Sequence, residues 1–166
     1  MSSLTFKNSP IETRGDFPVV GATAPDFKMV ARDLSEISLS DFKGKKVLLN
    51  IFPSVDTAVC GLQLKNFSEK AAGLKDTVLL FVSLDLPFAF SRFCAAEGIE
   101  NAVTASDFRY QALGQHYGVA MESGPLSGLY ALAVLLLDEE QKVVYTELVS
   151  EVTHEPDYGA AIAAVG

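Results

Sequence analysis

The sequence has few residues of the types that hold a structural metal ion. It contains two cysteines, Cys60 and Cys94, and two histidines, His116 and His154. The cysteines are too far apart for a CxxC pair, and so few thiols and imidazoles rarely complete a four-ligand zinc site. In a reducing compartment, a pair this sparse is either two buried thiols or a couple that forms a disulfide transiently. We therefore expect no metal site.

Long apolar runs and an excess of basic residues are also absent. The longest apolar run, LYALAVLLL at 129–137, is too short to cross a bilayer. Lys and Arg number 13 against 21 Asp and Glu, and the resulting net charge of −8 repels phosphate backbones. The first residues, MSSLTFKNSPIET, lack the basic start and apolar stretch of a secretory signal. These absences predict a cytoplasmic protein that binds neither nucleic acid nor membranes.

The composition that remains is that of a compact globular protein. Hydrophobic residues make up 49% of the 166 residues, which is enough to bury a continuous core. No internal repeat or low-complexity tract is visible. We expect one domain that spans residues 1–166.

The pattern of apolar residues predicts alternating strands and helices. Residues 47–52 and 77–83 are apolar on both faces, as central strands covered on both sides must be. Helical spacing follows each strand, after Thr57 and again from Pro87 to Gly98. The other expected elements are a hairpin (4–6 and 11–13), strands at 27–31, 36–39, 102–105, 129–137 and 142–148, a helix with Phe108, Ala112, Leu113, His116 and Tyr117 on one face, and a last helix from Pro156. This order predicts an α/β three-layer sandwich whose mixed sheet has three parallel strands and a closing antiparallel hairpin.

The stretch FPSVDTAVCG at 52–61 places Cys60 at the start of a predicted helix. With Thr57 as N-cap, Cys60 occupies N3, where unpaired N–H groups and the helix dipole favour a thiolate. A thiol with a pKa near 8.5 is only about 3% ionised at pH 7, whereas a pKa of roughly 6 gives about 90%. The ring of Pro53 can shield the sulfur from water. Asp56 would oppose ionisation if it faced the sulfur, and we expect it to point away.

Position alone leaves two interpretations of each cysteine open. Cys60 is either an activated thiol or a small buried hydrophobe, the commoner fate of a free cytosolic cysteine. Cys94 shares one helical face with Phe90 and Phe93, which by itself indicates a core residue. A bond between cysteines on two different helices would also require local unfolding of one or both.

Pro53, Thr57 and Cys60 form the pattern P-x-x-x-T-x-x-C, which resembles the active-site motif of the peroxiredoxins. FPSVDTAVC as a whole resembles the thiol peroxidase subfamily, the atypical two-cysteine peroxiredoxins. The resemblance covers almost the full chain and includes the segments DLPFAFSRFC (85–94), SDFR (106–109), GPLSGL (124–129) and EVTHEPDY (151–158). It implies a thioredoxin-like fold that carries an N-terminal β-hairpin.

The resemblance also implies a reaction. Cys60 is then the peroxidatic cysteine, which attacks a peroxide and becomes a sulfenic acid, with Pro53 and Thr57 beside it in the active site. Cys94 is the resolving cysteine, which forms an intramolecular disulfide with Cys60. Thioredoxin is the implied reductant for hydrogen peroxide or alkyl hydroperoxide turnover, no cofactor is required, and a homodimer is expected.

One position departs from the subfamily pattern. Related thiol peroxidases carry an arginine on the strand after the GPLxGL loop, and here Leu132 takes its place. Arg92 and Arg109 are the candidates to supply the charge instead, although both are expected as surface or ion-pair residues, and Lys65 is expected to point away. We therefore expect a peroxidase that is weakened, or tuned to larger and more apolar peroxides.

Two alternatives to an efficient peroxidase stay open. Because Leu132 replaces the arginine, the first alternative is a peroxide sensor or thiol-exchange protein with weak turnover. A thioredoxin-fold binding module with two inert cysteines is the other. Peroxide-induced disulfide formation separates both redox functions from the inert module.

Overall fold

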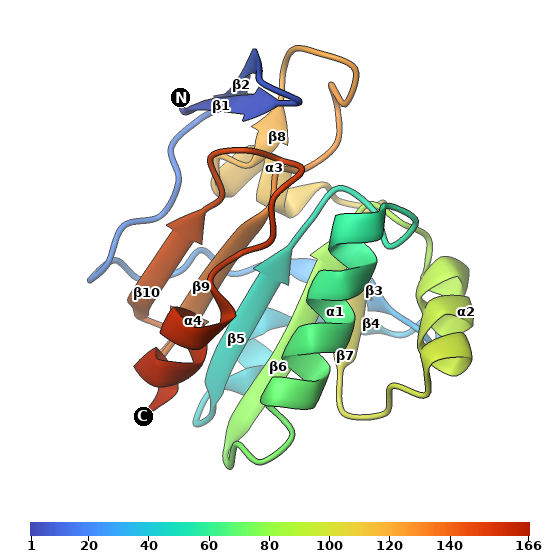
Figure 1. Cartoon of the computed structure of the whole chain (residues 1–166). Coiled ribbons are helices and arrows are strands. Elements are labelled where there is room, and N and C mark those ends of the chain that lie inside the picture. Colours follow the sequence, from blue (N-terminus) through green and yellow to red (C-terminus); the bar gives the residue numbers. More distant parts are fainter.

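A computed structural model covers residues 1–166 and shows a seven-stranded mixed sheet (Figure 1). The strand order is β10-β9-β5-β6-β7-β3-β4, and β5, β6 and β7 run parallel while the other neighbours pair antiparallel. The strands are β3 (Lys28–Ala31), β4 (Glu36–Ser38), β5 (Lys46–Ile51), β6 (Thr77–Ser83), β7 (Val103–Ser106), β9 (Ala133–Leu137) and β10 (Val143–Leu148). The predicted mixed sheet is confirmed, with β5 inside it.

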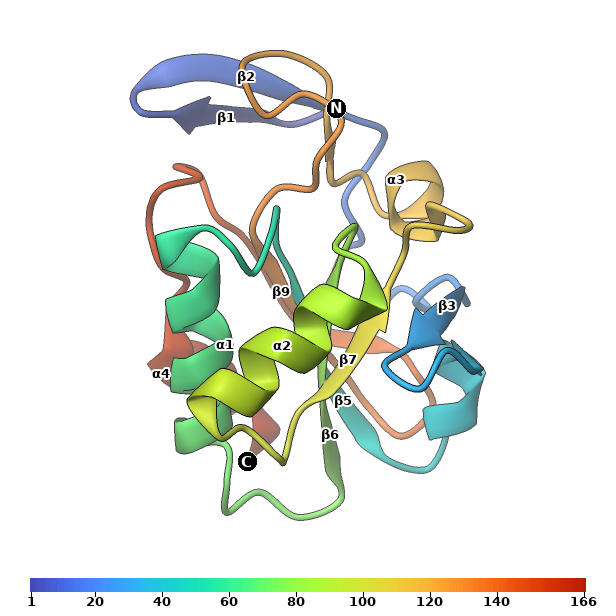
Figure 2. The same ribbon diagram turned by 90° about the vertical axis from the view of Figure 1, so that its right-hand side faces the viewer.

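Helices cover both faces of this sheet and complete the predicted three layers (Figure 2). They are α1 (Ala58–Lys70), α2 (Pro87–Glu97), α3 (Ala112–His116), α4 (Tyr158–Val165) and the 3-10 helix η1 (Leu39–Phe42). Buried residues of α1, α2 and α4 share one cluster, and those of α3 and η1 share the other. Successive strand residues alternate between the two, as Leu48 and Leu49 of β5 do. None of these helices combines the length and apolar character that a bilayer span needs.

The junctions after β5 and β6 bring the two cysteine-bearing helices to the same edge of the sheet. Both strands run in parallel, so α1 and α2 begin near their shared carboxyl ends. Thr57 caps α1, and Pro87 occupies the first turn of α2. α2 stops at Gly98, whose φ of 65° is left-handed and suits glycine. Local sequence signals thus account for both helix starts and for the end of α2.

A second, three-stranded sheet lies at the end of the molecule that holds the N-terminus (Figure 1). It contains the predicted hairpin, β1 (Ser3–Phe6) with β2 (Ser9–Arg14), and a third strand, β8 (Ala120–Met121). The sequence did not indicate β8, because two residues carry no periodicity and β8 forms only by pairing with distant β2.

Two predicted elements begin later than expected. The helix assigned to residues from Phe108 starts at Ala112, because the carboxylate of Asp107 caps the N–H groups of Ala112 and Leu113. Phe108 is consequently outside the helix and 37% exposed. The strand expected from 129 starts at Ala133, and the carbonyl of Leu132 instead accepts from the N–H of Val149.

Glu151 fastens the β1–β2 hairpin to the C-terminal segment. Its carboxylate accepts from the Asn8 N–H at 2.8 Å, the Thr5 hydroxyl at 3.0 Å and the Thr153 N–H at 2.8 Å. These hydrogen bonds favour the ionised form and lower the pKa of Glu151 from 4.5 to about 2.

Replacement of Glu151 by glutamine should lower the stability of the protein in a pH-dependent way. A depressed pKa in the folded state contributes stability that is complete above the unfolded pKa and is lost as the pH falls through the folded one. The wild type should therefore exceed Glu151→Gln in free energy of unfolding at pH 7, and the gap should narrow between about pH 4.5 and about 2. Urea denaturation at several pH values measures this difference in free energy of unfolding. Glu12→Gln, a substitution at an exposed glutamate, is the control. A constant gap across this range would contradict the assignment.

Candidate active site

Cys60 lies in the first turn of α1 and points into the protein core. Its side chain belongs to the cluster on the α1 face of the sheet, and the residue is 1% exposed. The hydroxyl of Thr57 accepts a hydrogen bond from the Cys60 N–H and donates one to the Ser54 carbonyl, both at 3.2 Å. Thr57 is therefore the N-cap and Cys60 the N3 residue, as the sequence predicted. Pro53 is buried at the start of the same loop.

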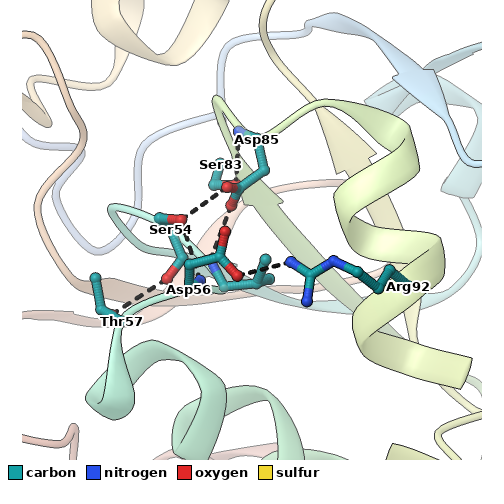
Figure 3. Close-up of polar contacts among 7 residues, drawn as sticks. Ser54, Asp56, Thr57, Ser83, Asp85 and Arg92 are labelled. Carbon is teal, nitrogen blue, oxygen red and sulfur yellow. Dashed lines mark hydrogen bonds and ion pairs between the residues drawn. The ribbon is translucent and has the colours of Figure 1, made fainter. Parts of the chain in front are cut away.

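The carboxylate of Asp85 holds the loop that precedes α1 (Figure 3). It accepts from the Ser54 hydroxyl at 2.7 Å and from the Val55 N–H at 2.9 Å, so it fixes two successive loop residues. The Ser83 hydroxyl supplies a third hydrogen bond at 2.5 Å. Sequence reasoning missed Asp85. Its position just after β6, beside the carboxyl end of β5, was the available signal.

Burial raises the pKa of the Cys60 thiol, and the negative charge of Asp85 adds to that rise. Hydrogen bonding from the Ser54 backbone and the Thr57 hydroxyl acts in the opposite direction but is the weaker effect. The helix N-terminus, which favours a thiolate, therefore does not determine the Cys60 pKa in this packed state, because the sulfur is almost completely removed from water. The packed arrangement favours the neutral thiol.

Asp56 points away from Cys60, as expected. Its carboxylate lies 2.7 Å from the guanidinium of Arg92 on α2, and both side chains are more than 60% exposed (Figure 3). The carboxylate that acts on the Cys60 sulfur is thus Asp85 rather than Asp56. The ion pair also links the α1 loop to the helix that carries Cys94.

No cation takes the place of the subfamily arginine. Leu132 is completely buried in the same cluster as Cys60. Arg92 is engaged by Asp56, Arg109 lies 3.7 Å from Glu36, and Lys65 lies 3.7 Å from Glu97. All three candidate cations are therefore ion-pair residues at the surface.

A buried amide pair lies one helical turn beyond Cys60, and the sequence analysis did not single it out. Gln63 is fully buried, and its Nε2 donates to Oδ1 of Asn50 on β5 at 3.3 Å. Its Oε1 has no hydrogen-bond partner. A buried acceptor without a donor lowers the stability of the folded state by about 1–3 kcal/mol. A hydrogen-bond donor placed near this oxygen would offset that cost.

Cys94 lies on α2 and belongs to the same buried cluster as Cys60. Both cysteines are free thiols, and each is 1% exposed. Phe93, the neighbour of Cys94, packs against Gly61, the neighbour of Cys60; a Cβ at Gly61 would meet the Phe93 ring at 3.2 Å. The two helices are thus packed together where the cysteines lie. No group of His, Cys, Asp and Glu side chains is arranged to hold a metal ion.

A mixed sheet between two helical layers, with a capped cysteine at the start of the first sheet-covering helix, defines a thioredoxin-like thiol protein. Residues 19–162 match the model of the Redoxin family. Thiol peroxidases from Corynebacterium glutamicum and Mycobacterium bovis are 47% and 49% identical to the chain, over 99% and 100% of it and 99% of each relative. A peroxiredoxin-like protein from Aquifex aeolicus matches with a TM-score of 0.95 and 38% identity, over 99% of this chain and 96% of that one. The chain therefore belongs to the redoxin family and, within it, to the thiol peroxidases.

Thr57 should determine how readily Cys60 ionises. In a Cys94→Ser background, where Cys60 is the sole thiol, Thr57→Val removes both the helix cap and a hydroxyl that favours the thiolate. A hydrogen bond to a charged group contributes about 1.5–3 kcal/mol, so the peroxide rate at pH 7 should fall roughly tenfold or more. Stopped-flow kinetics measures this.

Thr57→Ser is the matched control, because it keeps the hydroxyl, and its rate should stay within about threefold of the parent. Urea denaturation separately reports the loss of the cap, about 1 kcal/mol for the valine variant. Equal peroxide rates for the valine and serine variants would refute this role of Thr57.

Proposed function

We propose that the chain reduces hydrogen peroxide or alkyl hydroperoxides through Cys60, with Cys94 as the resolving cysteine. Thiol-dependent peroxide reduction follows from membership of the thiol peroxidases. The observation that supports these two residues is that a cysteine at the capped start of α1 shares its buried cluster with the only other cysteine of the chain. Thr57 and Pro53 complete the proposed site.

The reaction has three steps in this proposal. The Cys60 thiolate attacks one oxygen of the O–O bond, which gives a sulfenic acid and releases water or an alcohol after proton uptake. The Cys94 sulfur then attacks the Cys60 sulfenic sulfur, which forms the disulfide and releases a second water. A dithiol reductant finally returns both cysteines to thiols and is itself oxidised to a disulfide.

Opening of the packed site is part of this mechanism. Both sulfurs are buried, and the resting arrangement favours the neutral Cys60 thiol. A movement of α1 or α2 that admits water and peroxide would relieve the desolvation that opposes the thiolate. The same movement would bring the two sulfurs to bonding distance, about 2 Å.

Thioredoxin is the proposed reductant, because it is a dithiol that exchanges with disulfides of this kind. We also propose a cytoplasmic homodimer that binds no nucleic acid. Exposed apolar side chains near the active-site edge support an interface there: Leu86 and Phe88 are 50% and 65% exposed. Phe108, which is 37% exposed, lies on a segment joined to the loop between β6 and α2, because its N–H donates to the Ser106 hydroxyl, which in turn donates to the Asp85 carbonyl.

The alternative of a sensor or exchange protein with weak turnover is not favoured. The chain matches thiol peroxidases over their full length at close to half identity. Leu132 therefore bears on how fast the enzyme works and on which peroxides it prefers. We therefore still propose peroxidase activity, although Leu132 stands at the arginine position.

Titration with peroxide followed by mass spectrometry tests the roles of the two cysteines. One equivalent should convert the wild type to the Cys60–Cys94 disulfide. Cys94→Ser should stop at the Cys60 sulfenic acid and, with excess peroxide, give the sulfinic acid. Cys60→Ser should leave Cys94 reduced.

Thioredoxin with its reductase and NADPH, added to the oxidised wild type, should restore both thiols. A free Cys60 in the presence of excess peroxide would exclude its peroxidatic role. Oxidation of Cys60 without a disulfide to Cys94 would exclude only the resolving role, and failure with thioredoxin alone would exclude only that reductant.

Leu132→Arg tests what the missing arginine costs. A guanidinium beside the sulfur would stabilise the thiolate and the charge that develops on the peroxide. We expect the rate with hydrogen peroxide to rise at least about tenfold. Stopped-flow kinetics with hydrogen peroxide and cumene hydroperoxide measures the rate and the preference.

Leu132→Met is the control for a change of side-chain shape without charge, and circular dichroism checks that the arginine variant folds. The hypothesis that leucine favours apolar peroxides expects the preference for cumene hydroperoxide to fall in the arginine variant. An unchanged or lower hydrogen peroxide rate in folded Leu132→Arg would contradict the claim that leucine limits catalysis.

A further inference from the structure

Arg32 is the arginine without a carboxylate partner. Arg14, Arg92 and Arg109 form ion pairs with Glu122, Asp56 and Glu36. Arg32 follows β3 at the edge of the main sheet and is half-buried. Its one hydrogen bond is a long one, 3.5 Å from Nη2 to the Ala102 carbonyl. A guanidinium is always charged, so this positive charge lacks a matching negative one.

One surface cleft is lined by both Arg32 and Cys94. It has a volume of about 640 Å³, and its walls include Arg32, Ser91, Cys94, Ala95, Ile99 and Glu100. Burial raises the pKa of the Cys94 thiol, and the Arg32 charge acts against that rise. The other charged groups at the cleft are the exposed carboxylates of Asp33 and Glu100. Asp33 is occupied by hydrogen bonds from the Ser35 N–H and hydroxyl.

We propose that Arg32 is a positioning residue for the resolving step: across the cleft that the two residues line, its guanidinium opposes the effect of burial and so favours the Cys94 thiolate that attacks oxidised Cys60. The proposal rests on the resolving role of Cys94 given above. In this step the Cys94 thiolate forms a bond to the Cys60 sulfur of the sulfenic acid, and the S–O bond breaks with release of hydroxide. A thiolate is far more nucleophilic than a thiol, so the charge of Arg32 speeds disulfide formation by making the Cys94 thiolate easier to form.

The consequence for the enzyme is protection of Cys60. A sulfenic acid that waits for its partner meets a second peroxide and becomes a sulfinic acid, which a thiol reductant does not reverse. Fast resolution keeps this loss small. Arg32 thus affects the resistance of Cys60 to overoxidation more than its first reaction with peroxide, because Arg32 shares a cleft with Cys94 and not with Cys60.

The first test isolates Cys94 in a Cys60→Ser background and follows its alkylation by iodoacetamide from pH 6 to 10. Arg32→Met should shift the pH profile to higher pH and slow alkylation at pH 7 about three- to tenfold. Arg32→Lys keeps the positive charge and should recover most of the rate. Arg109→Met, which removes an arginine that does not line the cleft, should match the parent.

The pH profile of alkylation distinguishes loss of the Arg32 charge from a structural change in α2. A variant that merely loosens α2 would expose Cys94 and speed alkylation at every pH, whereas loss of the charge moves the midpoint. A profile of Arg32→Met that coincides with that of the parent, or that is faster throughout, would overturn the proposal. This experiment does not depend on peroxidase activity.

The second test uses the enzyme with both cysteines. After repeated peroxide additions with reductant present, Arg32→Met should accumulate at least about threefold more Cys60 sulfinic acid than the wild type, while sulfenic acid forms at an unchanged rate. Equal sulfinic acid in the two proteins would exclude Arg32 from resolution. If the wild type formed no Cys60–Cys94 disulfide, the proposed function of Cys94 would fail as well, and the alkylation profile would show whether Arg32 still controls its charge.

Discussion

The carboxylate of Asp85 is the contact on which the active site depends. It ties the loop that follows β5 to the end of β6, through Ser54 and Val55 on one side and Ser83 on the other. The loop then presents Thr57 in the geometry of a helix cap, and the cap places Cys60 at N3. Three hydrogen bonds to one partly buried charge are strong enough to hold such a loop. The same charge lies near enough to Cys60 to oppose its ionisation.

Burial and reactivity compete at both cysteines. The packed state keeps the two sulfurs out of water, which protects them from unselective oxidation but disfavours the thiolates. The contacts that hold the cysteine-bearing helices together at the surface are the pairs of Asp56 with Arg92 and Lys65 with Glu97. Exposed ion pairs contribute little, about 0–1 kcal/mol, so they oppose opening only weakly. The greater resistance comes from Phe93 and the buried cluster behind it.

Leu132 changes the balance of charges around Cys60. In this chain the positive groups that sequence reasoning considered are all paired elsewhere, and the residue at the arginine position is part of the core. The ionised group that acts on the Cys60 sulfur, Asp85, is negative. Gln63, one helical turn after Cys60, carries a buried oxygen without a hydrogen-bond partner. In the proposed mechanism, the groups that favour the Cys60 thiolate are therefore the Ser54 backbone and the Thr57 hydroxyl.

The sequence by itself determined the features that local chemistry controls. The strands at 47–52 and 77–83, the Thr57 cap, the Pro87 and Gly98 limits of α2 and the positions of both cysteines follow from periodicity, capping preference and motif spacing. Only the tertiary structure decided which distant groups meet. It placed Asp85 on the active-site loop and Arg32 on the Cys94 cleft, and it paired β8 with β2. It also decided the direction of the Cys60 pKa shift, because desolvation depends on everything that packs around the sulfur and not on its place in the helix.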